Sequence, residues 1–133
     1  MADEVRVPID SEADIVAARQ KGRELAAQCG FPSTDLAVVA TAISELARNI
    51  VRYAARGEII LRLIDTDGRR AVEVEAADEG PGILDIPLAM QDGYSTSGSL
   101  GLGLPGVRRL MDEFDISSES GKGTTVKARK WKR

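Results

Sequence analysis

The chain begins with an alternating apolar pattern and continues with a helical one. Val5, Val7 and Ile9 alternate with polar neighbours, which predicts a short half-buried strand. Apolar residues then recur at helical spacing over residues 14–29, and Ser11 has the residue type and position of an N-cap. The first thirty residues therefore predict a strand followed by a helix.

A second and longer helical pattern follows Pro32 and ends near Gly57. Ser33 or Thr34 is the expected N-cap, because a hydroxyl can accept a hydrogen bond from a free N–H group of the first turn. The apolar rows of this helix predict one buried face, made of Leu36, Val39, Ile43, Leu46, Ile50 and Tyr53.

The second half of the chain predicts four strands and one helix. The strands span residues 58–65, 69–77, 114–119 and 124–130, and the helix spans 105–114. Asp67-Gly68 between the first two strands is a strong hairpin signal. The glycine-rich stretch from 78 to 103 has no such pattern, and an irregular loop of roughly 20 residues in a small domain indicates a functional lid. The expected fold is an α+β two-layer sandwich, with an antiparallel or mixed sheet on one layer and three helices on the other.

The amino-acid composition excludes several kinds of catalysis and several classes of partner. The 133 residues and 43% hydrophobic content predict one domain over residues 1–133. The chain has no histidine, which excludes imidazole catalysis and phosphohistidine chemistry. Its one cysteine, Cys29, excludes an intramolecular disulfide and fits a reducing cytoplasm. The net charge of −3 argues against nucleic acid as a partner, and no apolar run is long enough to span a membrane. We therefore expect a cytoplasmic protein with neither nucleic acid nor membrane as a partner.

The first candidate group for chemistry lies on the long helix. Glu45 and Asn49 are four residues apart and share one helix face. A carboxylate can orient a nucleophile, and an amide oxygen can bind Mg²⁺, which prefers oxygen ligands. Taken alone, however, such a pair is more typical of a solvated polar face.

The second candidate group, Asp78-Glu79-Gly80-Pro81-Gly82, directly follows a predicted strand. An aspartate at a strand end can accept a hydrogen bond from an exocyclic amine such as that of adenine. Glycines allow the backbone to approach a flat ring, because they have no Cβ. Without further context the segment is equally typical of an ordinary turn.

The third candidate group is Gly101-Leu102-Gly103-Leu104-Pro105-Gly106, at the start of a predicted helix. The N–H groups at a helix N-terminus can hold phosphate. The pattern matches a dinucleotide-binding fingerprint, but no strand precedes it and too little chain follows for a βαβ unit. The glycine-rich loop of the protein kinase fold is excluded as well, because its catalytic motif requires a histidine. A last segment, 121–125, reads GKGTT and is typical of a hairpin turn rather than a phosphate-binding Walker loop.

The order of these segments is more specific than any one of them. ELARN at 45–49, DEGPG at 78–82, GLGLPG at 101–106 and GKGTT at 121–125 resemble the N, G1, G2 and G3 boxes of the GHKL ATP-binding superfamily, in the right order. The resemblance covers about residues 34–125 and implies the Bergerat fold, with ATP and Mg²⁺ as cofactors.

The resemblance implies a role for each matching position. Glu45 is implied as the general base or water-orienting carboxylate, and Asn49 as the Mg²⁺ ligand next to the phosphates. Asp78 is implied as the residue that recognises adenine, with Thr125 or Thr124 supporting it from behind. The remaining implied positions line the adenine or bind the phosphates under the lid: Gly80, Gly82, Thr96, Ser97, Gly98, Gly101, Leu102, Gly103, Leu104 and Gly106.

Further segments narrow the resemblance to small serine/threonine kinases of bacterial partner-switching systems. DIVAARQ, TAISELARNI, GYSTSGSLGLGLPGVRRLMDEF and a final KWKR are similar to the stress-response switch kinases of that group. This implies phosphorylation of serine or threonine on STAS-domain proteins in the stressosome. It also implies a second role, in which the released kinase activates a PP2C-type phosphatase.

Two alternatives remain. An anti-sigma factor kinase resembles this chain in every box but binds a sigma factor, so co-purification of a sigma factor or of a STAS-domain protein would separate the two readings. A non-catalytic module that uses ATP only as a conformational ligand is the other alternative, and the presence of Glu45 argues against it.

Overall fold

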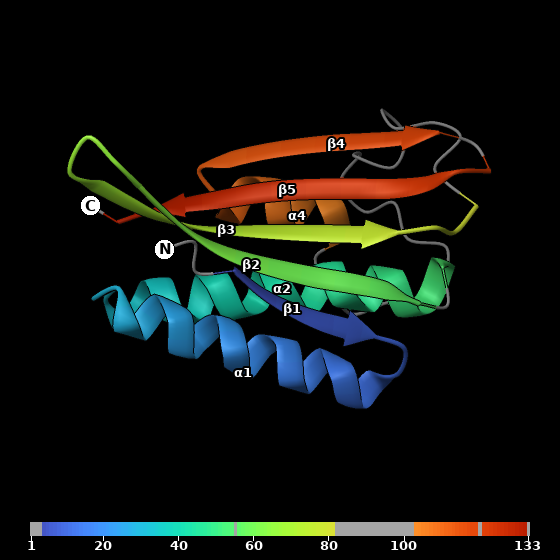
Figure 1. The fold of residues 1–133 in the computed structure, drawn as a ribbon, viewed down its shortest axis with the longest axis horizontal. Coiled ribbons are helices and arrows are strands. Elements are labelled where there is room, and N and C mark those ends of the chain that lie inside the picture. Colours follow the sequence, from blue (N-terminus) through green and yellow to red (C-terminus); the bar gives the residue numbers. More distant parts are fainter. Residues whose placement is uncertain (1–3, 55, 82–102, 120, 133) are drawn as a thin grey trace.

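The computed structural model describes residues 4–54, 56–81, 103–119 and 121–132. Three helices and five strands lie in these residues (Figure 1). In chain order they are β1 (Glu4–Ile9), α1 (Glu12–Gln28), α2 (Ser33–Tyr53), β2 (Gly57–Thr66), β3 (Arg69–Asp78), α4 (Gly103–Leu110), β4 (Glu113–Glu119) and β5 (Gly123–Trp131). None of the helices in this part of the chain is long and apolar enough to cross a membrane.

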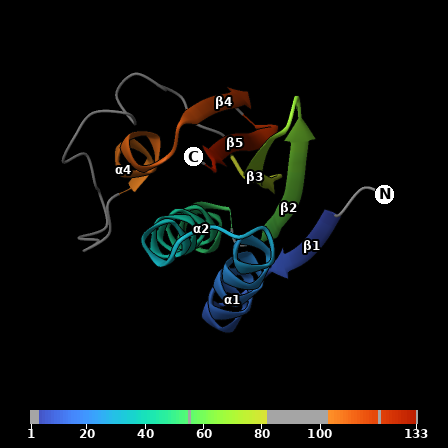
Figure 2. The same cartoon turned by 90° about the vertical axis from the view of Figure 1, so that its left-hand side faces the viewer.

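The strands form one sheet in the order β1-β2-β3-β5-β4, and every neighbouring pair is antiparallel. The described helices lie on one face of this sheet, with α2 between α1 and α4 (Figure 2). The predicted α+β two-layer sandwich is confirmed, and the sheet is antiparallel rather than mixed.

The predicted hairpin at Asp67-Gly68 is confirmed. Thr66 pairs with Arg69, and both turn residues have positive φ, 53° for Asp67 and 74° for Gly68. Two left-handed residues form the type I′ turn that matches the twist of the flanking strands. The local residue types therefore determine both the turn and the register of β2 against β3.

The helix boundaries differ from the predictions by a few residues, and the differences at the start of α2 and at the ends of α4 affect the caps. The N-cap of α2 is Pro32 rather than Ser33 or Thr34, because the Pro32 carbonyl accepts hydrogen bonds from the N–H groups of Asp35 and Leu36. Ser33 is therefore already helical. Helix α4 starts at 103 and ends at 110 instead of spanning 105–114. It ends early because the chain joins the sheet directly afterwards. The Asp112 N–H already donates to the carbonyl of Arg129 in β5, at 2.8 Å.

The core lies between the helices and the sheet. Alternate residues of the strands face it, such as Val72 and Val74 of β3, and both are fully buried. The side chains of Ile43 and Leu46 meet them from α2. The predicted buried face of α2 is confirmed except at its ends, because Leu36 is only partly buried and Tyr53 is 49% exposed.

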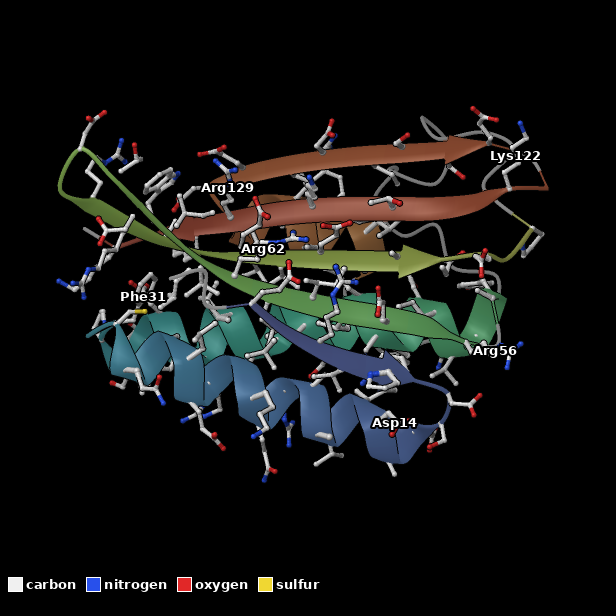
Figure 3. The ribbon with its side chains drawn as sticks, viewed as in Figure 1. Asp14, Phe31, Arg56, Arg62, Lys122 and Arg129 are labelled. Carbon is white, nitrogen blue, oxygen red and sulfur yellow. The ribbon has the colours of Figure 1, made fainter. Side chains whose placement is uncertain are left out.

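The opposite face of the sheet carries charged side chains that pair across the strands. Glu73 of β3 is only 4% exposed and accepts hydrogen bonds from Arg129 (2.7 Å) and Arg62 (3.0 Å). Figure 3 shows Arg62 and Arg129 on this face, away from the helices. Arg62 also contacts Glu4 and Glu75, at 2.8 Å and 2.6 Å. The ion-pair network thus links β1, β2, β3 and β5 on the face that no described helix covers.

Candidate active site

Glu45 lies on the buried side of α2, where that helix packs against α4. Only 8% of the residue is exposed, and it is the one charged member of the buried residues of α2, a helix that the structure describes in full. Its Oε1 accepts a hydrogen bond from the Gly103 N–H at 3.0 Å, and its Oε2 contacts Arg48 Nη1 at 2.5 Å. The carboxylate therefore joins the middle of α2 to the first residue of α4.

Asn49 follows Glu45 by one helical turn and is half-buried. Residues four apart on a helix lie one above the other on the same face. The amide of Asn49 and the carboxylate of Glu45 therefore lie next to each other along α2.

Asp78 is the last residue of β3, and backbone N–H groups hold its side chain. Oδ1 accepts hydrogen bonds from Gly80 at 2.9 Å and from Thr124 at 3.3 Å. One oxygen of the carboxylate is thus held by the backbone, which fixes the direction of the other oxygen.

Glycines allow three segments to meet around Asp78. A Cβ on Gly80 would lie 2.6 Å from the Cβ of Ala54, at the end of α2. A Cβ on Gly57 would lie 2.4 Å from the Ala77 carbonyl oxygen, and one on Gly123 would lie 2.1 Å from the Asp78 carbonyl oxygen. Real Cβ atoms do not approach this closely, so the end of β3 can have its present neighbours only because these positions are glycine.

Residues 8–130 match the family described as the histidine kinase-like ATPase domain. The chain belongs to this family. It is 53% identical, over the full length of both chains, to "Serine/threonine-protein kinase RsbT" of Bacillus subtilis. It is also 33% identical over 112 residues to "Anti-sigma F factor" of Caldanaerobacter subterraneus, covering 80% of this chain and 77% of that relative.

Two solved structures share the fold of this ATPase domain. A crystal structure of the RsbU and RsbW domains of a Mycobacterium tuberculosis protein has a TM-score of 0.65 at 21% identity, covering 100% of this chain and 33% of that one. The mycobacterial sensor histidine kinase MprB has a TM-score of 0.56 at 16% identity, covering 97% and 99% of the two chains. At these identities the likeness concerns the fold alone.

The similarities confirm the family that the ordered motifs indicated. They also confirm the predicted enzyme class, an ATP-dependent protein serine/threonine kinase, because the full-length relative carries that name at 53% identity. The use of ATP follows from the ATPase domain.

Among the described residues, the expected site residues of this ATPase domain make two groups of contacts. Glu45 and Gly103 are in contact, and Asp78 contacts both Gly80 and Thr124. Leu104 and Gly106 are buried in the first turns of α4, and Leu104 belongs to the hydrophobic core. Gly82, Thr96, Ser97, Gly98, Gly101 and Leu102 lie outside the described residues.

The two threonines that the sequence left as alternatives differ in position. Thr124 pairs with Asp78 across the β3–β5 ladder, and its N–H donates to the Asp78 carboxylate. Thr125 pairs with Ala77, so its side chain points to the opposite face of the sheet. Of the two, Thr124 is the one that contacts Asp78.

Sequence reasoning missed three features of this site. No role was assigned to Arg48 from the sequence, although Arg48 contacts the Glu45 carboxylate. The Ser118 hydroxyl lies 2.9 Å from the Thr124 hydroxyl, and so links β4 to the strand that holds Asp78. Gly57 was assigned only to the end of a helix, but it lies against the end of β3. The i, i+3 spacing of Glu45 and Arg48 was a usable signal, whereas the other two contacts join distant segments and carry no local pattern.

Proposed function

We propose that this chain transfers the γ-phosphate of ATP to serine or threonine of STAS-domain partner proteins, in a cytoplasmic partner-switching system for stress response. The full-length similarity to a protein named serine/threonine-protein kinase RsbT supports the partner class. The arrangement of the site supports the chemistry.

The contact between Glu45 and Gly103 is the observation that carries the proposal. It brings a buried carboxylate within 3.0 Å of a backbone N–H at the start of α4. Helix N-termini favour anions such as phosphates, because their first N–H groups have no partner within the helix. A phosphate held at α4 would therefore lie close to the carboxylate that is to act on the acceptor.

The nucleotide end of the site fits adenine. The free oxygen of Asp78 can accept a hydrogen bond from the exocyclic amine, because Gly80 and Thr124 occupy its other oxygen. Gly80 has no Cβ that could obstruct a flat ring, and a Cβ there would already collide with Ala54.

Asn49 is the proposed protein ligand of Mg²⁺. An amide oxygen suits this cation, which is usually held by one or two protein groups together with the phosphates of the nucleotide. In the described part of the chain no cluster of three or more acidic, histidine or cysteine side chains could hold a metal by itself. When bound, Mg²⁺ neutralises charge on the phosphates and fixes their orientation.

In the proposed reaction, the acceptor hydroxyl oxygen attacks the γ-phosphorus of ATP in line with the bond to the β,γ-bridging oxygen. A new O–P bond forms, the bond to the bridging oxygen breaks, and ADP leaves. Glu45 accepts the hydrogen bond of the hydroxyl and takes its proton, because lone pairs remain on both carboxylate oxygens besides those used by Arg48 and Gly103. Catalysis consists mainly of positioning and charge neutralisation.

The test is transfer of labelled γ-phosphate from Mg-ATP to purified STAS-domain proteins encoded beside this gene. We expect label on serine or threonine of the partner, identified after acid hydrolysis. The same partner with its acceptor serine or threonine changed to alanine is the control. ATP binding without transfer to any STAS-domain protein would contradict the proposal and favour the non-catalytic ATP-gated module.

The anti-sigma factor kinase is the second candidate, and the similarity to anti-sigma F factors supports it. Both candidates use the same site, so the partner decides between them. Purification of the tagged chain from its own cells should recover a STAS-domain protein, whereas recovery of a sigma factor would favour the second candidate.

A further proposed role is activation of a PP2C-type phosphatase by the released kinase. Addition of the chain to such a phosphatase from the same system should raise its activity towards a phosphorylated STAS-domain protein. No change in phosphatase activity would remove this part of the proposal and would leave the kinase reaction unaffected.

A further inference from the structure

Arg48 connects the Glu45 carboxylate to the protein surface. Its Nη1 lies 2.5 Å from Glu45 Oε2, and its side chain is 35% exposed, whereas that of Glu45 is 10% exposed. The other oxygen of Glu45 accepts the hydrogen bond of Gly103. Arg48, Glu45 and Gly103 thus form a continuous chain of contacts from the surface of α2 to the first residue of α4.

Arg48 also lines a surface cavity of about 260 Å³ between α1 and α2. The other lining residues are Glu12, Ile15, Val16, Arg19 and Ser44. The second arginine of this cavity, Arg19, is exposed and lies on α1. Arg48 therefore both lines this cavity and contacts the carboxylate of Glu45.

The Glu45 carboxylate needs a partner that fixes its orientation. The terminal torsion of a glutamate is broad, so the carboxylate plane is not fixed by rotamer preference alone. A carboxylate with so little exposure also needs charged or hydrogen-bonding partners, since desolvation penalises its charge. Arg48 supplies the charge and holds Oε2, and this leaves Oε1 facing the Gly103 N–H.

We propose that Arg48 is a positioning residue for phosphoryl transfer. It holds the Glu45 carboxylate in the orientation that both contacts Gly103 and presents lone pairs to the acceptor hydroxyl. The catalytic part of this inference rests on the proposed kinase function, whereas the structural part, the link from Arg48 to the start of α4, does not. Lysine can supply the charge but not the planar fork of a guanidinium, so Arg48→Lys should preserve the role only in part.

The first readout is hydrogen exchange of the backbone N–H groups at the start of α4, followed by mass spectrometry. In Arg48→Gln we expect exchange at Gly103 to rise at least about tenfold, because the carboxylate loses its fixed orientation. In a Glu45→Ala background, where the contact is already absent, Arg48→Gln should cause no further rise. Unchanged exchange in Arg48→Gln would overturn the proposal whether or not the chain transfers phosphate.

The second readout is the transfer reaction itself. Arg48→Gln should lower kcat by about tenfold to a hundredfold and leave the KM for ATP unchanged, because a displaced catalytic group slows the chemical step. Arg48→Lys should recover part of the loss. An equal loss of kcat and of ATP affinity, together with a lower Tm, would indicate a merely structural role and overturn the proposal.

Two control variants separate positioning from other effects of charge. Arg19→Gln removes the other arginine of the cavity without removing a contact of Glu45, and Arg23→Gln removes a positive charge from an exposed position of α1. Both should keep the wild-type kcat and the wild-type exchange at Gly103. If Arg19→Gln lowers kcat as much as Arg48→Gln does, the charge of the cavity matters rather than the position of Glu45, and the proposal fails.

Discussion

At the scale of single residues, the site relies on two carboxylates that hydrogen bonds within the protein already hold in place. Glu45 is held by Arg48 and by the Gly103 N–H, and Asp78 is held by the N–H groups of Gly80 and Thr124. These hydrogen bonds fix the orientation of both carboxylates before any ligand binds. This pre-organisation reduces the entropy that binding must overcome.

Asp78→Asn tests the proposed adenine contact. The asparagine oxygen can still accept from Gly80 and Thr124, so the fold around β3 should persist. Its amide nitrogen, however, would then face the adenine amine, and two donors would meet. Hydrogen bonds to charged groups contribute about 1.5–3 kcal/mol, so Mg-ATP should bind roughly ten to a hundred times more weakly. Isothermal titration calorimetry measures this directly, and an unchanged affinity would remove Asp78 from the adenine role.

At the scale of elements, the β4–β5 hairpin and the end of β3 form one unit. Gly123 begins β5 with φ at +102° and lies against the backbone of Asp78 and Glu79. Ser118 of β4 contacts both the Gly123 carbonyl and the Thr124 hydroxyl, at 3.0 Å and 2.9 Å. The hairpin therefore supports Asp78 from the side of β3 opposite to β2.

Alanine substitutions at Gly123 and Gly121 separate the destabilising effect of a close atomic contact from that of backbone strain. In Gly123→Ala the new Cβ would lie 2.1 Å from the Asp78 carbonyl oxygen, and φ is also unfavourable, so we expect a loss of about 3–5 kcal/mol of unfolding free energy. Gly121 also has positive φ, +79°, but nothing lies within 4 Å of its would-be Cβ. Gly121→Ala should therefore cost only about 1–2 kcal/mol.

Chemical denaturation of the two glycine variants gives both values. Mg-ATP affinity should fall in folded Gly123→Ala, because Asp78 is displaced, and should stay near the wild-type value in Gly121→Ala. Equal losses of stability in both variants would show that φ strain alone matters and that the close contact at Asp78 does not.

At the scale of the whole molecule, the two faces of the sheet are stabilised by different means. The helix-facing side buries apolar residues, whereas the other side joins β1, β2, β3 and β5 through the ion pairs of Arg62 and Arg129. Burial by itself would raise the pKa of Glu73, but the hydrogen bonds from Arg129 and Arg62 outweigh it, and the pKa lies below its ordinary value of 4.5. Hydrogen bonds from Arg62 and Arg6 likewise lower the pKa of Glu4.

This network predicts how stability depends on pH. A carboxyl group whose pKa is lower in the folded chain than in the unfolded chain stabilises the fold above its unfolded value, here near 4.5. This contribution is lost as the pH falls through the folded value. Thermal unfolding between pH 3 and pH 7 should therefore show a Tm that declines below about pH 4.5.

The matched variant for the pH series is Glu73→Gln. It should lose on the order of 2 kcal/mol of unfolding free energy at pH 7, because the charge-assisted hydrogen bonds of Arg62 and Arg129 are weakened. Its acid decline should be shallower than that of the wild type. The same slope in both proteins would show that Glu73 does not contribute to the acid dependence.

The parts of the fold that could be predicted from the sequence are those that depend on neighbouring residues. The alternation at Val72 and Val74 gives a strand, and Asp67-Gly68 gives its turn, because both patterns act on neighbouring residues. The N-cap is Pro32 and not Ser33, because the carbonyl of Pro32 accepts the hydrogen bonds from the N–H groups of the first helical turn. Residue type alone does not predict this, because serine and threonine are the more usual N-cap residues.

The candidate site was predictable as a set of residues but not as a set of contacts. The four ordered motifs gave Glu45, Asn49 and Asp78. The contact of Glu45 with Gly103 joins residues 58 positions apart, and a choice between Thr124 and Thr125 needs the register of β5 against β3. Such tertiary contacts depend on packing, and no local pattern encodes them.

We propose that the Glu45 carboxylate is needed for transfer and not for ATP binding. Glu45→Gln tests it most directly, because the amide oxygen can still accept from the Gly103 N–H while the charge and the basic oxygen are lost. Single-turnover transfer to the proposed STAS-domain partner should fall by at least about a hundredfold, with Mg-ATP affinity within about twofold of the wild type. Transfer at the wild-type rate, or loss of ATP binding together with transfer, would contradict this role of Glu45.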